Sequence, residues 1–436
     1  MTENKNNKEP DIASIILAGG QGTRLYPITK YHSKPAVSYG GRYRLIDIPI
    51  SNSLNSDIRK IFVIGQYMIS ELQHHLSQTY QFDPFHPGMI DVLSPEERPF
   101  GEKIWFDGTA DAVRKNINEI LKSQAEYFLI LSGDQLYNIN FKKMFDFAKQ
   151  TNADLTIASL PVKEKDAKRY GLLKVNKESI IQDFFEKPQE EEILNRFKLN
   201  EQFFNDHQME LNEKHYLASM GIYIFKRDTL KNLLIEDPRE DFGKHLIPTQ
   251  LKKESTCAAF IYDGYWEDIG TVASFYEANI ALTDKKFKGL DTYDEENPIF
   301  TKANHLPGTQ IHGTIINQSI ICEGSIIEAK EISSSIIGLR SKIKKGTVIK
   351  NSVLMNNNYY LPPITHQRLK KHPEKFEIGQ NCLIEKAIID EHVFIGNNVK
   401  LTNKENHQNY DGEHLFVRDG IIIVPYGANI PDDFEF

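Results

Sequence analysis

The last third of the chain places an aliphatic residue at every sixth position, and this period restricts the fold more than any other feature of the sequence. Glycines and small polar residues separate the aliphatic positions. A six-residue apolar period is typical of a parallel β-helix, in which each short strand stacks an inward side chain on the coil below. The pattern therefore predicts a β-helix over residues 311–436. The aliphatic positions are Ile321 and Ile327, then Ile337, Ile343 and Ile349, then Ile378 and Ile384, then Ile389, Ile395 and Leu401.

A β-helix of this kind has two functional interpretations. It is either a rigid module for oligomerisation or regulation, or the scaffold of an acyltransferase site. An acyltransferase needs a catalytic base, and the histidines of this segment lie at scattered places such as His366 and His392. The pattern therefore favours the rigid module.

A second constraint lies near the start of the chain, where a short apolar strand runs directly into a glycine-rich turn. The turn contains Gly19, Gly20 and Gly22. Without Cβ atoms, these residues let backbone N–H groups approach an anionic ligand and adopt positive φ. Arg24 and Lys34 bring positive charge to the same place, the first as a bidentate fork and the second as a point charge. The stretch predicts a binding site for a triphosphate.

Two better-known phosphate loops are excluded by the same residues. The P-loop string of Gly, four residues and Gly-Lys-Ser/Thr does not occur in the chain. The dinucleotide fingerprint requires a third glycine where this chain has Leu25. The predicted phosphate site therefore belongs to another class of loop.

The residues that follow alternate between strand and helix patterns. A strand pattern over 58–66 precedes helical spacing over 69–76, and a short helix is expected near 51–56. This alternation predicts an α/β domain whose mixed, mostly parallel sheet resembles a Rossmann sheet, with helices on both faces. Ligands of such sheets lie beyond the carboxyl ends of the strands, where the glycine turn and Gln66 both fall.

A small-residue turn begins at Gly108 and opens a helix that is predicted to run to about Leu121. Thr109 and Ala110 keep this turn small enough for a flat base to lie against the backbone. Asp111 falls in the first helical turn, where a carboxylate also favours the helix dipole. The turn is a candidate for contact with a nucleoside.

Two aspartates are candidates for a metal site. Asp134 follows an apolar strand over 127–131, and Asp268 precedes a Gly-Thr turn far downstream. Mg²⁺ prefers oxygen donors and keeps several waters, so two carboxylates from distant strand ends could hold one ion between phosphate oxygens. The alternative for Asp134 is the cap of the next helix.

Several polar residues beside glycine or proline are candidates for contact with a second, phosphorylated substrate. Lys187 could neutralise a phosphate monoester, while Glu186, Ser219 and Asp241 could hydrogen-bond to hydroxyl groups. The alternative for Glu186 and Lys187 is a solvated ion pair at the surface.

Composition excludes some functional classes. The chain carries 60 acidic against 52 basic residues, a formal net charge of -8, which argues against a general binder of nucleic acid or membrane surfaces. Cys257, Cys322 and Cys382 are too widely separated for a zinc pattern and indicate buried thiols in a reducing compartment. No apolar stretch has the length of a membrane span, and the first residues lack the features of a signal or transit peptide. We expect a cytoplasmic protein, or one whose targeting segment has been removed.

These patterns divide the chain into segments. A disordered N-terminus is expected over 1–11 and an α/β domain over 12–287. Residues 288–310 lose periodicity and gather Pro298, Pro307 and Gly308, so they are interpreted as a linker. The β-helix follows over 311–436.

Together these stretches resemble ADP-glucose pyrophosphorylase, that is glucose-1-phosphate adenylyltransferase, over nearly the whole chain. Residues 43–49 and 403–406 look more like the plant and cyanobacterial branch than the enterobacterial one. The stretches that carry the likeness are 17–25, 34–37, 43–51, 108–113, 131–137, 185–188, 218–223, 241–243 and 266–271.

The resemblance implies a nucleotidyltransferase domain, a left-handed β-helix and assembly as a homotetramer or as a heterotetramer of related subunits. It implies the reaction of ATP with α-D-glucose 1-phosphate to give ADP-glucose and pyrophosphate, the committed step toward glycogen or starch. By the family's motifs, Arg24 and Lys34 would hold the triphosphate, and Asp134 and Asp268 would hold Mg²⁺. The nucleotide would lie at Gly19, Gly20, Gly22, Thr23, Gln66, Gly108, Thr109, Ala110 and Asp111, and glucose 1-phosphate at Gly171, Glu186, Lys187, Ser219, Asp241 and Trp266.

Some residues depart from the family pattern. Gln135 replaces the usual His after the strand-end Gly-Asp, and Tyr31 and His32 replace more basic residues. Tyr426 stands where plant-like members carry Lys, although Lys404 is retained. These positions, with His32 and Lys404 as candidate effector contacts, are associated with anionic activators, so fewer cations should weaken the binding of phosphate effectors.

Two alternative functions stay open. One is a pyrophosphorylase for another pair of nucleoside triphosphate and sugar phosphate, because the glycine turn does not distinguish bases or sugars. The other is a non-catalytic regulatory subunit that binds nucleotides for a partner chain. Such a subunit should have lost cationic or metal-binding residues, yet Arg24, Lys34, Asp134 and Asp268 are all present.

Overall fold

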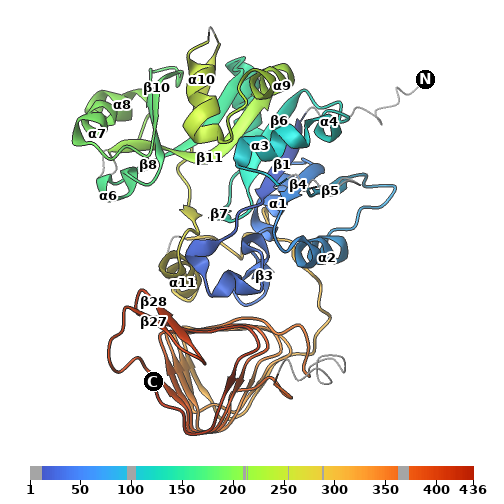
Figure 1. The fold of residues 1–436 in the computed structure, drawn as a ribbon, viewed down its shortest axis with the longest axis vertical. Coiled ribbons are helices and arrows are strands. Elements are labelled where there is room, and N and C mark those ends of the chain that lie inside the picture. The colour runs from blue at the N-terminus through green and yellow to red at the C-terminus, as the bar shows by residue number, and fades with distance from the viewer. Residues whose placement is uncertain are drawn as a thin grey trace.

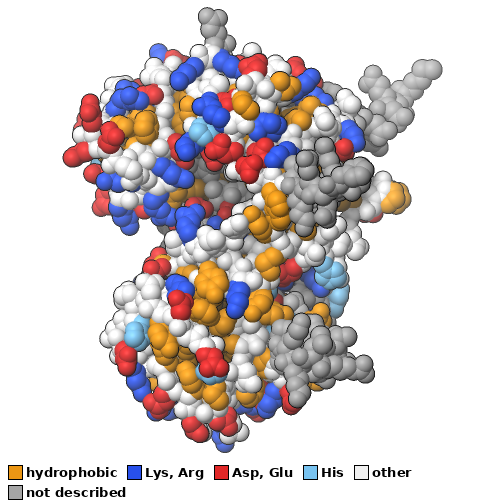
Figure 2. All heavy atoms as spheres, viewed as in Figure 1, with side chains coloured by type: hydrophobic (Ala, Val, Ile, Leu, Met, Phe, Trp, Pro, Cys, Tyr) orange, Lys and Arg blue, Asp and Glu red, His pale blue; other side chains and the backbone are white. Residues whose placement is uncertain are grey.

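The computed structural model describes residues 12–95, 105–209, 213, 215–253, 255–286, 289–361 and 373–436. An α/β domain leads through an extended connection into a triangular β-helix (Figure 1). The segment predicted to be disordered, 1–11, lies outside the described residues, and so do 287, 288 and His366. The space-filling view shows a waist between the two domains, and it shows basic and acidic side chains interspersed over this face of the first domain (Figure 2).

The α/β domain is built on a mixed sheet, as predicted. From one edge the strands are β10 (Ile181–Glu186), β9 (Gly171–Val175), β11 (Tyr216–Lys226), β6 (Tyr127–Ser132), β1 (Ile12–Ala18), β4 (Lys60–Gly65) and β5 (Met89–Leu93), with β8 (Leu155–Val162) beside β11 and β12 (Cys257–Ile261) beside β8. Strands β6, β1, β4 and β5 are parallel, so their carboxyl ends meet at one edge. Strand β11 runs antiparallel to β6 and brings a second set of loops to that edge.

The helices cover both faces of this sheet (Figure 1). In the described part of the chain, every helix falls short of the length and apolar content that a membrane crossing requires. The helices are α1 (Asp47–Asn55), α2 (Ile69–Thr79), α3 (Thr109–Lys115), α4 (Ile117–Ile120), α5 (Phe141–Gln150), α6 (Glu164–Ala167), α7 (Glu191–Phe197), α8 (Glu201–Asp206), α9 (Arg227–Glu236), α10 (Ile247–Leu251) and α11 (Val272–Ala281).

Two predicted helices differ from those observed. The helix expected near 51–56 begins earlier, at Asp47, because Pro49 is tolerated in a first helical turn, where N–H groups lack intrahelical partners. The helix expected from Gly108 to Leu121 is interrupted at Asn116, which separates α3 from α4. The Asn116 side chain donates a hydrogen bond of 2.8 Å to the carbonyl of Ala112 and competes with the helical pattern.

A small two-stranded ribbon lies next to the main sheet. Strand β7 (Gln135–Tyr137) follows β6 after a two-residue turn, and it pairs antiparallel with β13 (Trp266–Asp268). In this register Gln135 lies opposite Asp268. The ribbon therefore carries the end of a late segment of the chain to the carboxyl end of β6.

The β-helix stacks its inward aliphatic side chains in three columns, which confirms the prediction from the six-residue period. One column contains Ile327, Ile343, Ile378, Ile395 and Ile430, and all of these side chains are buried. The other two columns contain Ile332, Ile349, Ile384 and Leu401, and Ile337, Leu354, Ile389 and Val424. The strands are β14 (Gln310–Ile311), β15 (Ile315–Asn317), β16 (Ile320–Ile321), β17 (Ile326–Ile327), β18 (Glu331–Ser333), β19 (Ile336–Ile337), β20 (Lys342–Ile343), β21 (Val348–Lys350), β22 (Val353–Leu354), β23 (Leu383–Glu385), β24 (Ala387–Ile389), β25 (Phe394–Ile395), β26 (Lys400–Leu401), β27 (Asn409–Asp411), β28 (Phe416–Arg418), β29 (Ile421–Val424) and β30 (Asn429–Ile430).

The connection between the domains is fastened to the first domain by a buried carboxylate. Asp47 is fully buried and accepts hydrogen bonds from the Thr301 hydroxyl (2.7 Å) and the Tyr80 hydroxyl (2.8 Å). It also lies 2.6 Å from Nε2 of His75 on α2. One side chain on α1 thus ties α2 and the connecting segment together.

Candidate active site

A first cavity of about 510 Å³ opens at the carboxyl ends of β1, β4 and β6. Its size lies within the usual range for small-molecule sites. It contains most of the residues predicted to contact a nucleotide, namely Gly19, Gly20, Gln66, Gly108 and Thr109, together with Asp134.

Two glycines of the turn, Gly20 and Gly22, have different roles. Gly22 has φ of 65°, and a Cβ there would lie 2.8 Å from Cγ2 of Thr29, so this position requires glycine. Gly20 is exposed, and a Cβ there would meet no atom within 4 Å, so its backbone faces open space beside the cavity. The turn therefore presents backbone to the cavity at Gly20 and makes its sharp bend at Gly22.

Gln66 and Gly108 shape the opposite wall. The Gln66 amide exchanges two hydrogen bonds with the backbone of Phe106 and so holds the segment before α3. A Cβ on Gly108 would lie 2.4 Å from the carbonyl oxygen of Glu240, so the two backbones can approach only with glycine there. These contacts hold the wall that was predicted to receive a base.

Ala110 and Asp111 were predicted beside the nucleotide but are not among the described residues that line this cavity. Asp111 accepts a hydrogen bond of 2.9 Å from the N–H of Asp107 and forms an ion pair of 2.7 Å with Lys115. Burial opposes ionisation of this carboxyl, but these partners outweigh it and lower its pKa. Asp111 therefore stabilises the start of α3.

The aromatic side of the cavity was not predicted from the sequence. Tyr67 and Phe106 line it, and the Tyr67 ring stacks on Trp105 with centroids 5.3 Å apart and an interplanar angle of 24°. The Tyr67 hydroxyl also accepts a hydrogen bond of 2.8 Å from Gln21. The signal was available, since Tyr67 comes directly after the strand-end Gln66.

A second cavity of about 590 Å³ adjoins the first. Of the residues predicted to receive a sugar phosphate, it contains Gly171, Glu186, Lys187, Ser219 and Trp266. Asp241 instead lines the first cavity, which Glu186 lines as well. The exposed cation Arg169 belongs to the second cavity and was not predicted, although it lies two residues before Gly171.

Glu186 lies between the two cavities and is partly buried. Lys187 is 3.5 Å from its carboxylate, so the predicted ion pair exists. Burial is the main cause that raises the pKa of Glu186; the Lys187 charge opposes the rise and the Asp241 charge adds to it. The pair is therefore part of a cavity wall as well as a surface ion pair.

Four charged side chains meet where the cavities join. Lys34 is nearly buried, at 8% exposure, and its Nζ donates to the Asp134 carboxylate, which also accepts from the Ser132 hydroxyl. Burial and then the charge of Asp134 raise the pKa of Asp268, while Lys34 and Arg24 oppose the rise. The two aspartates, separated by more than a hundred positions, thus lie close enough for their charges to interact.

Arg24 completes this group from the glycine turn. A Cβ on Gly270 would lie 3.4 Å from Nη1 of Arg24 and 3.5 Å from Oδ2 of Asp268, which places both groups on one side of that glycine. Asp134 does not cap the next helix, because Asn140 holds that position and accepts from the N–H of Lys143. Carboxylates, a buried ammonium and a guanidinium are thus gathered at one junction.

Comparison with known families agrees with this arrangement. A family model described as nucleotidyl transferase matches residues 13–285. The chain belongs to the nucleotidyl transferase family. A second model, described as the GLGC left-handed parallel beta-helix domain, matches residues 304–434 and gives the handedness of the β-helix. The two matches together describe a sugar-phosphate nucleotidyltransferase with a β-helix of the GLGC type.

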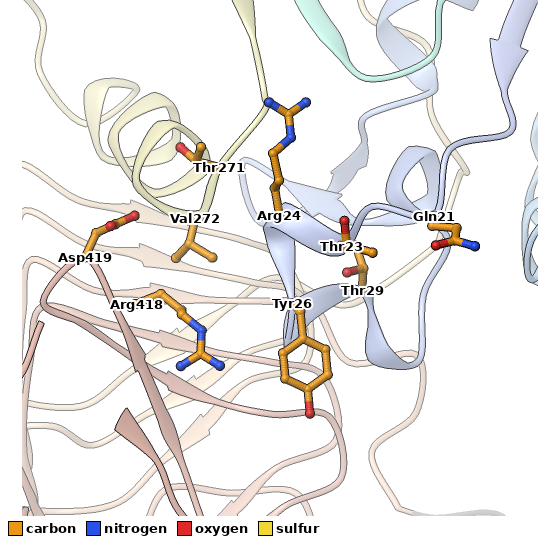
Figure 3. A pocket seen from close by; sticks show the side chains of 9 residues that line it. All are labelled: Gln21, Thr23, Arg24, Tyr26, Thr29, Thr271, Val272, Arg418 and Asp419. Carbon is orange, nitrogen blue, oxygen red and sulfur yellow. The ribbon is translucent and has the colours of Figure 1, made fainter. Parts of the chain in front are cut away.

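A third pocket of about 620 Å³ lies between the two domains of this nucleotidyltransferase (Figure 3). It is lined by the segment from Gln21 to Thr29, by the start of α11 and by Arg418 and Asp419 of the β-helix. Thr23, predicted beside the nucleotide, lines this pocket. The guanidinium groups of Arg24 and Arg418 point in opposite directions in Figure 3, so these two cations do not converge on one ligand here.

The candidate effector residues lie apart from the cavities. His32 is 4% exposed and lies 3.0 Å from Glu71 and 3.6 Å from Asp390 of the β-helix. Burial alone would lower its pKa, but the carboxylates outweigh burial and raise it well above the usual value. Lys404 is exposed and forms an ion pair of 2.7 Å with Glu435. His32 therefore acts in the structure as a link between the domains.

Next to His32, a buried carboxyl gives the domain contact a pH dependence. Burial raises the pKa of Glu391 to about 7 from an ordinary value of 4.5, although Arg44 and His32 oppose the rise. The folded state therefore keeps a proton that the unfolded state loses between these values, so stability falls as pH rises through this range. We expect Glu391→Gln to remove a fall of about 2 kcal/mol between pH 5 and 6.5, measured by urea unfolding.

The control for this measurement is Glu413→Gln, because Glu413 is an exposed glutamate of the same domain. It should keep the wild-type slope of stability against pH. The window ends at pH 6.5, about the ordinary pKa of histidine, so that each histidine of the unfolded chain has lost at most about half of its proton within the window. Equal slopes in the wild type and Glu391→Gln would show that Glu391 is ionised in the fold.

Proposed function

We propose that this nucleotidyltransferase makes ADP-glucose and pyrophosphate from ATP and α-D-glucose 1-phosphate, the committed step toward glycogen or starch. One observation carries the proposal: two cavities of suitable size share a wall, and the charged group of Lys34, Asp134, Asp268 and Arg24 lies where they join. The shared wall consists of Gln135, Glu186, Gly221 and Tyr223.

The reaction requires little covalent chemistry from the protein. A phosphate oxygen of glucose 1-phosphate attacks the α-phosphorus of ATP in line, and pyrophosphate leaves. The nucleophile is already anionic near neutral pH, so no general base is needed. Lys34 and Arg24 would neutralise the charge that develops on the phosphates, and the cavity walls would hold the two substrates in line.

The donor set fits a magnesium ion that is shared with substrate phosphates. Among the described residues there is no group of three or more His, Cys, Asp or Glu side chains that could hold a metal. Mg²⁺ sites of this chemistry use one or two carboxylates together with substrate phosphates, and Asp134 and Asp268 supply two carboxylates. A bound magnesium ion would supply positive charge to the phosphate oxygens.

The test is release of pyrophosphate by the purified chain with glucose 1-phosphate and, in turn, ATP, UTP, GTP and CTP. We expect the highest kcat/KM with ATP. A preference for another nucleotide would assign the same chemistry to a different substrate pair. Absence of release with every nucleotide and a panel of sugar phosphates would favour the non-catalytic regulatory subunit.

We also expect weak activation by anionic metabolites. The candidate effector position at His32 is buried and already paired with Glu71 and Asp390, so an added phosphate would meet negative charge. Adding 3-phosphoglycerate or fructose 1,6-bisphosphate should raise the rate of pyrophosphate release by less than about threefold. An activation of tenfold or more would contradict this expectation.

A further inference from the structure

Gln135, the first residue of β7, lies directly after Asp134 and opposite Asp268. It is 7% exposed and lines both cavities. Under the proposed function, the first cavity is the nucleotide-side cavity and the second is the sugar-side cavity. It therefore lies in the wall that the two cavities share.

Both ends of the Gln135 amide are bonded to the protein. Nε2 donates a hydrogen bond of 3.0 Å to the carbonyl of Met220, and Oε1 accepts one of 3.3 Å from the indole N–H of Trp266. An indole N–H can only donate and a carbonyl can only accept, so these partners fix which end of the amide faces which group. The side chain is therefore locked in one orientation between β11 and β13.

The two partners are walls of the sugar-side cavity. Trp266 is 9% exposed and packs edge-on against Tyr170, with centroids 5.0 Å apart. Met220 precedes Gly221, which has φ of 72° and lies where the pairing of β11 with β8 is irregular. Without the Gln135 amide, a buried N–H and a buried carbonyl would each lose their partner, which costs free energy unless the groups move.

We propose that Gln135 is a positioning residue for the sugar phosphate, an inference that rests on the proposed function. It holds the Trp266 indole and the irregular segment around Gly221 in the positions that shape the sugar-side cavity. Both polar ends of the amide serve the protein, so Gln135 acts on the substrate through these two walls. Its loss should therefore affect the sugar phosphate more than the nucleotide.

The first test is Gln135→Leu, which keeps a similar volume and removes both hydrogen bonds. We expect KM for glucose 1-phosphate to rise at least tenfold while KM for ATP stays within twofold. Gln135→His should recover most of this loss, because a neutral imidazole also carries one donor and one acceptor. Gln202→Leu is the matched control, since Gln202 is exposed on α8, and it should leave both constants unchanged.

The second test separates positioning from a merely structural role. Trp266→Phe keeps an aromatic ring and removes the indole N–H that donates a hydrogen bond to Gln135. If Gln135 acts through Trp266, the double variant should have a KM for glucose 1-phosphate close to that of the single variant with the higher KM. Multiplicative effects, or equal rises in KM for both substrates, would overturn the inference.

The outcome also distinguishes this inference from the proposed function. If the wild-type chain releases no pyrophosphate, the proposed function fails, and calorimetric titration of the wild type and Gln135→Leu with glucose 1-phosphate still measures the effect on affinity. An affinity unchanged by Gln135→Leu, with the variant folded by circular dichroism, would overturn the positioning role. An active wild type with unchanged KM values in the variant would overturn the inference alone.

Discussion

Asp134→Ala should lower kcat for pyrophosphate release by on the order of 10³-fold or more, the largest effect expected for any single substitution in this chain. Asp134 accepts from Lys34 and from the Ser132 hydroxyl at the point where the two cavities join. Its removal would leave Lys34 without its acceptor and would take one of the two carboxylates from the proposed magnesium site. The measurement is steady-state release of pyrophosphate with ATP and glucose 1-phosphate over a range of magnesium concentrations.

The fold should survive this substitution, because Asp134 lies in the turn between β6 and β7 and is only partly buried. Circular dichroism and the mass in solution should match the wild type. Asp228→Ala, an exposed aspartate on α9, should retain full activity. Near-normal activity of Asp134→Ala would remove Asp134 from the metal site and with it the mechanism proposed above.

The β-helix could be predicted from the sequence because its pattern is local and repeated. Every coil buries the same kind of side chain at the same offset, so Ile343 and Ile349 specify their columns without knowledge of the rest of the chain. The strand–turn elements of the first domain were predictable for a similar reason, since the residues after the parallel strands β1, β4 and β6 share one edge of the sheet. The period of the apolar residues was therefore enough to predict most of the architecture.

The contacts across the sheet could not be predicted in this way. Gln135 meets Trp266 and Met220 because β7, β13 and β11 converge there, and no local pattern encodes that convergence. Asp241 illustrates the same limit: its type suggested a sugar contact, whereas the fold places it in the first cavity beside Glu186. Residue type gave the chemistry of these positions, and tertiary packing decided which cavity they line.

The domain contact shows how burial changes the role of a residue type. His32 was a candidate contact for an anionic effector because it aligns with basic residues. The structure surrounds it with Glu71 and Asp390, so its positive charge is already paired with carboxylates of both domains. The segment that carries Arg24 and Lys34 is thus fixed to the β-helix by the residue that was expected to bind an effector.

Lys34→Ala should lower kcat by about 10²–10³-fold, the loss typical of a removed group that stabilises developing negative charge. The Lys34 side chain is nearly buried and donates to Asp134, and its charge also opposes the rise in the pKa of Asp268. Without this cation, the two carboxylates and the triphosphate would repel one another at the junction of the cavities. Lys34→Arg should lose less activity than Lys34→Ala, because it keeps the positive charge. It should still lose some activity, because it does not keep the compact shape of the lysine ammonium.

The matched control is Lys30→Ala, since Lys30 is an exposed cation of the same segment, and it should change kcat by less than twofold. Because Lys34 and Asp134 are directly bonded, the double variant Lys34→Ala/Asp134→Ala should be little worse than Asp134→Ala. Losses that multiply would mean that the two residues act separately. A kcat for Lys34→Ala within threefold of the wild type would show that the buried ammonium serves the fold alone, and the triphosphate would then have to be neutralised by Arg24 and the metal.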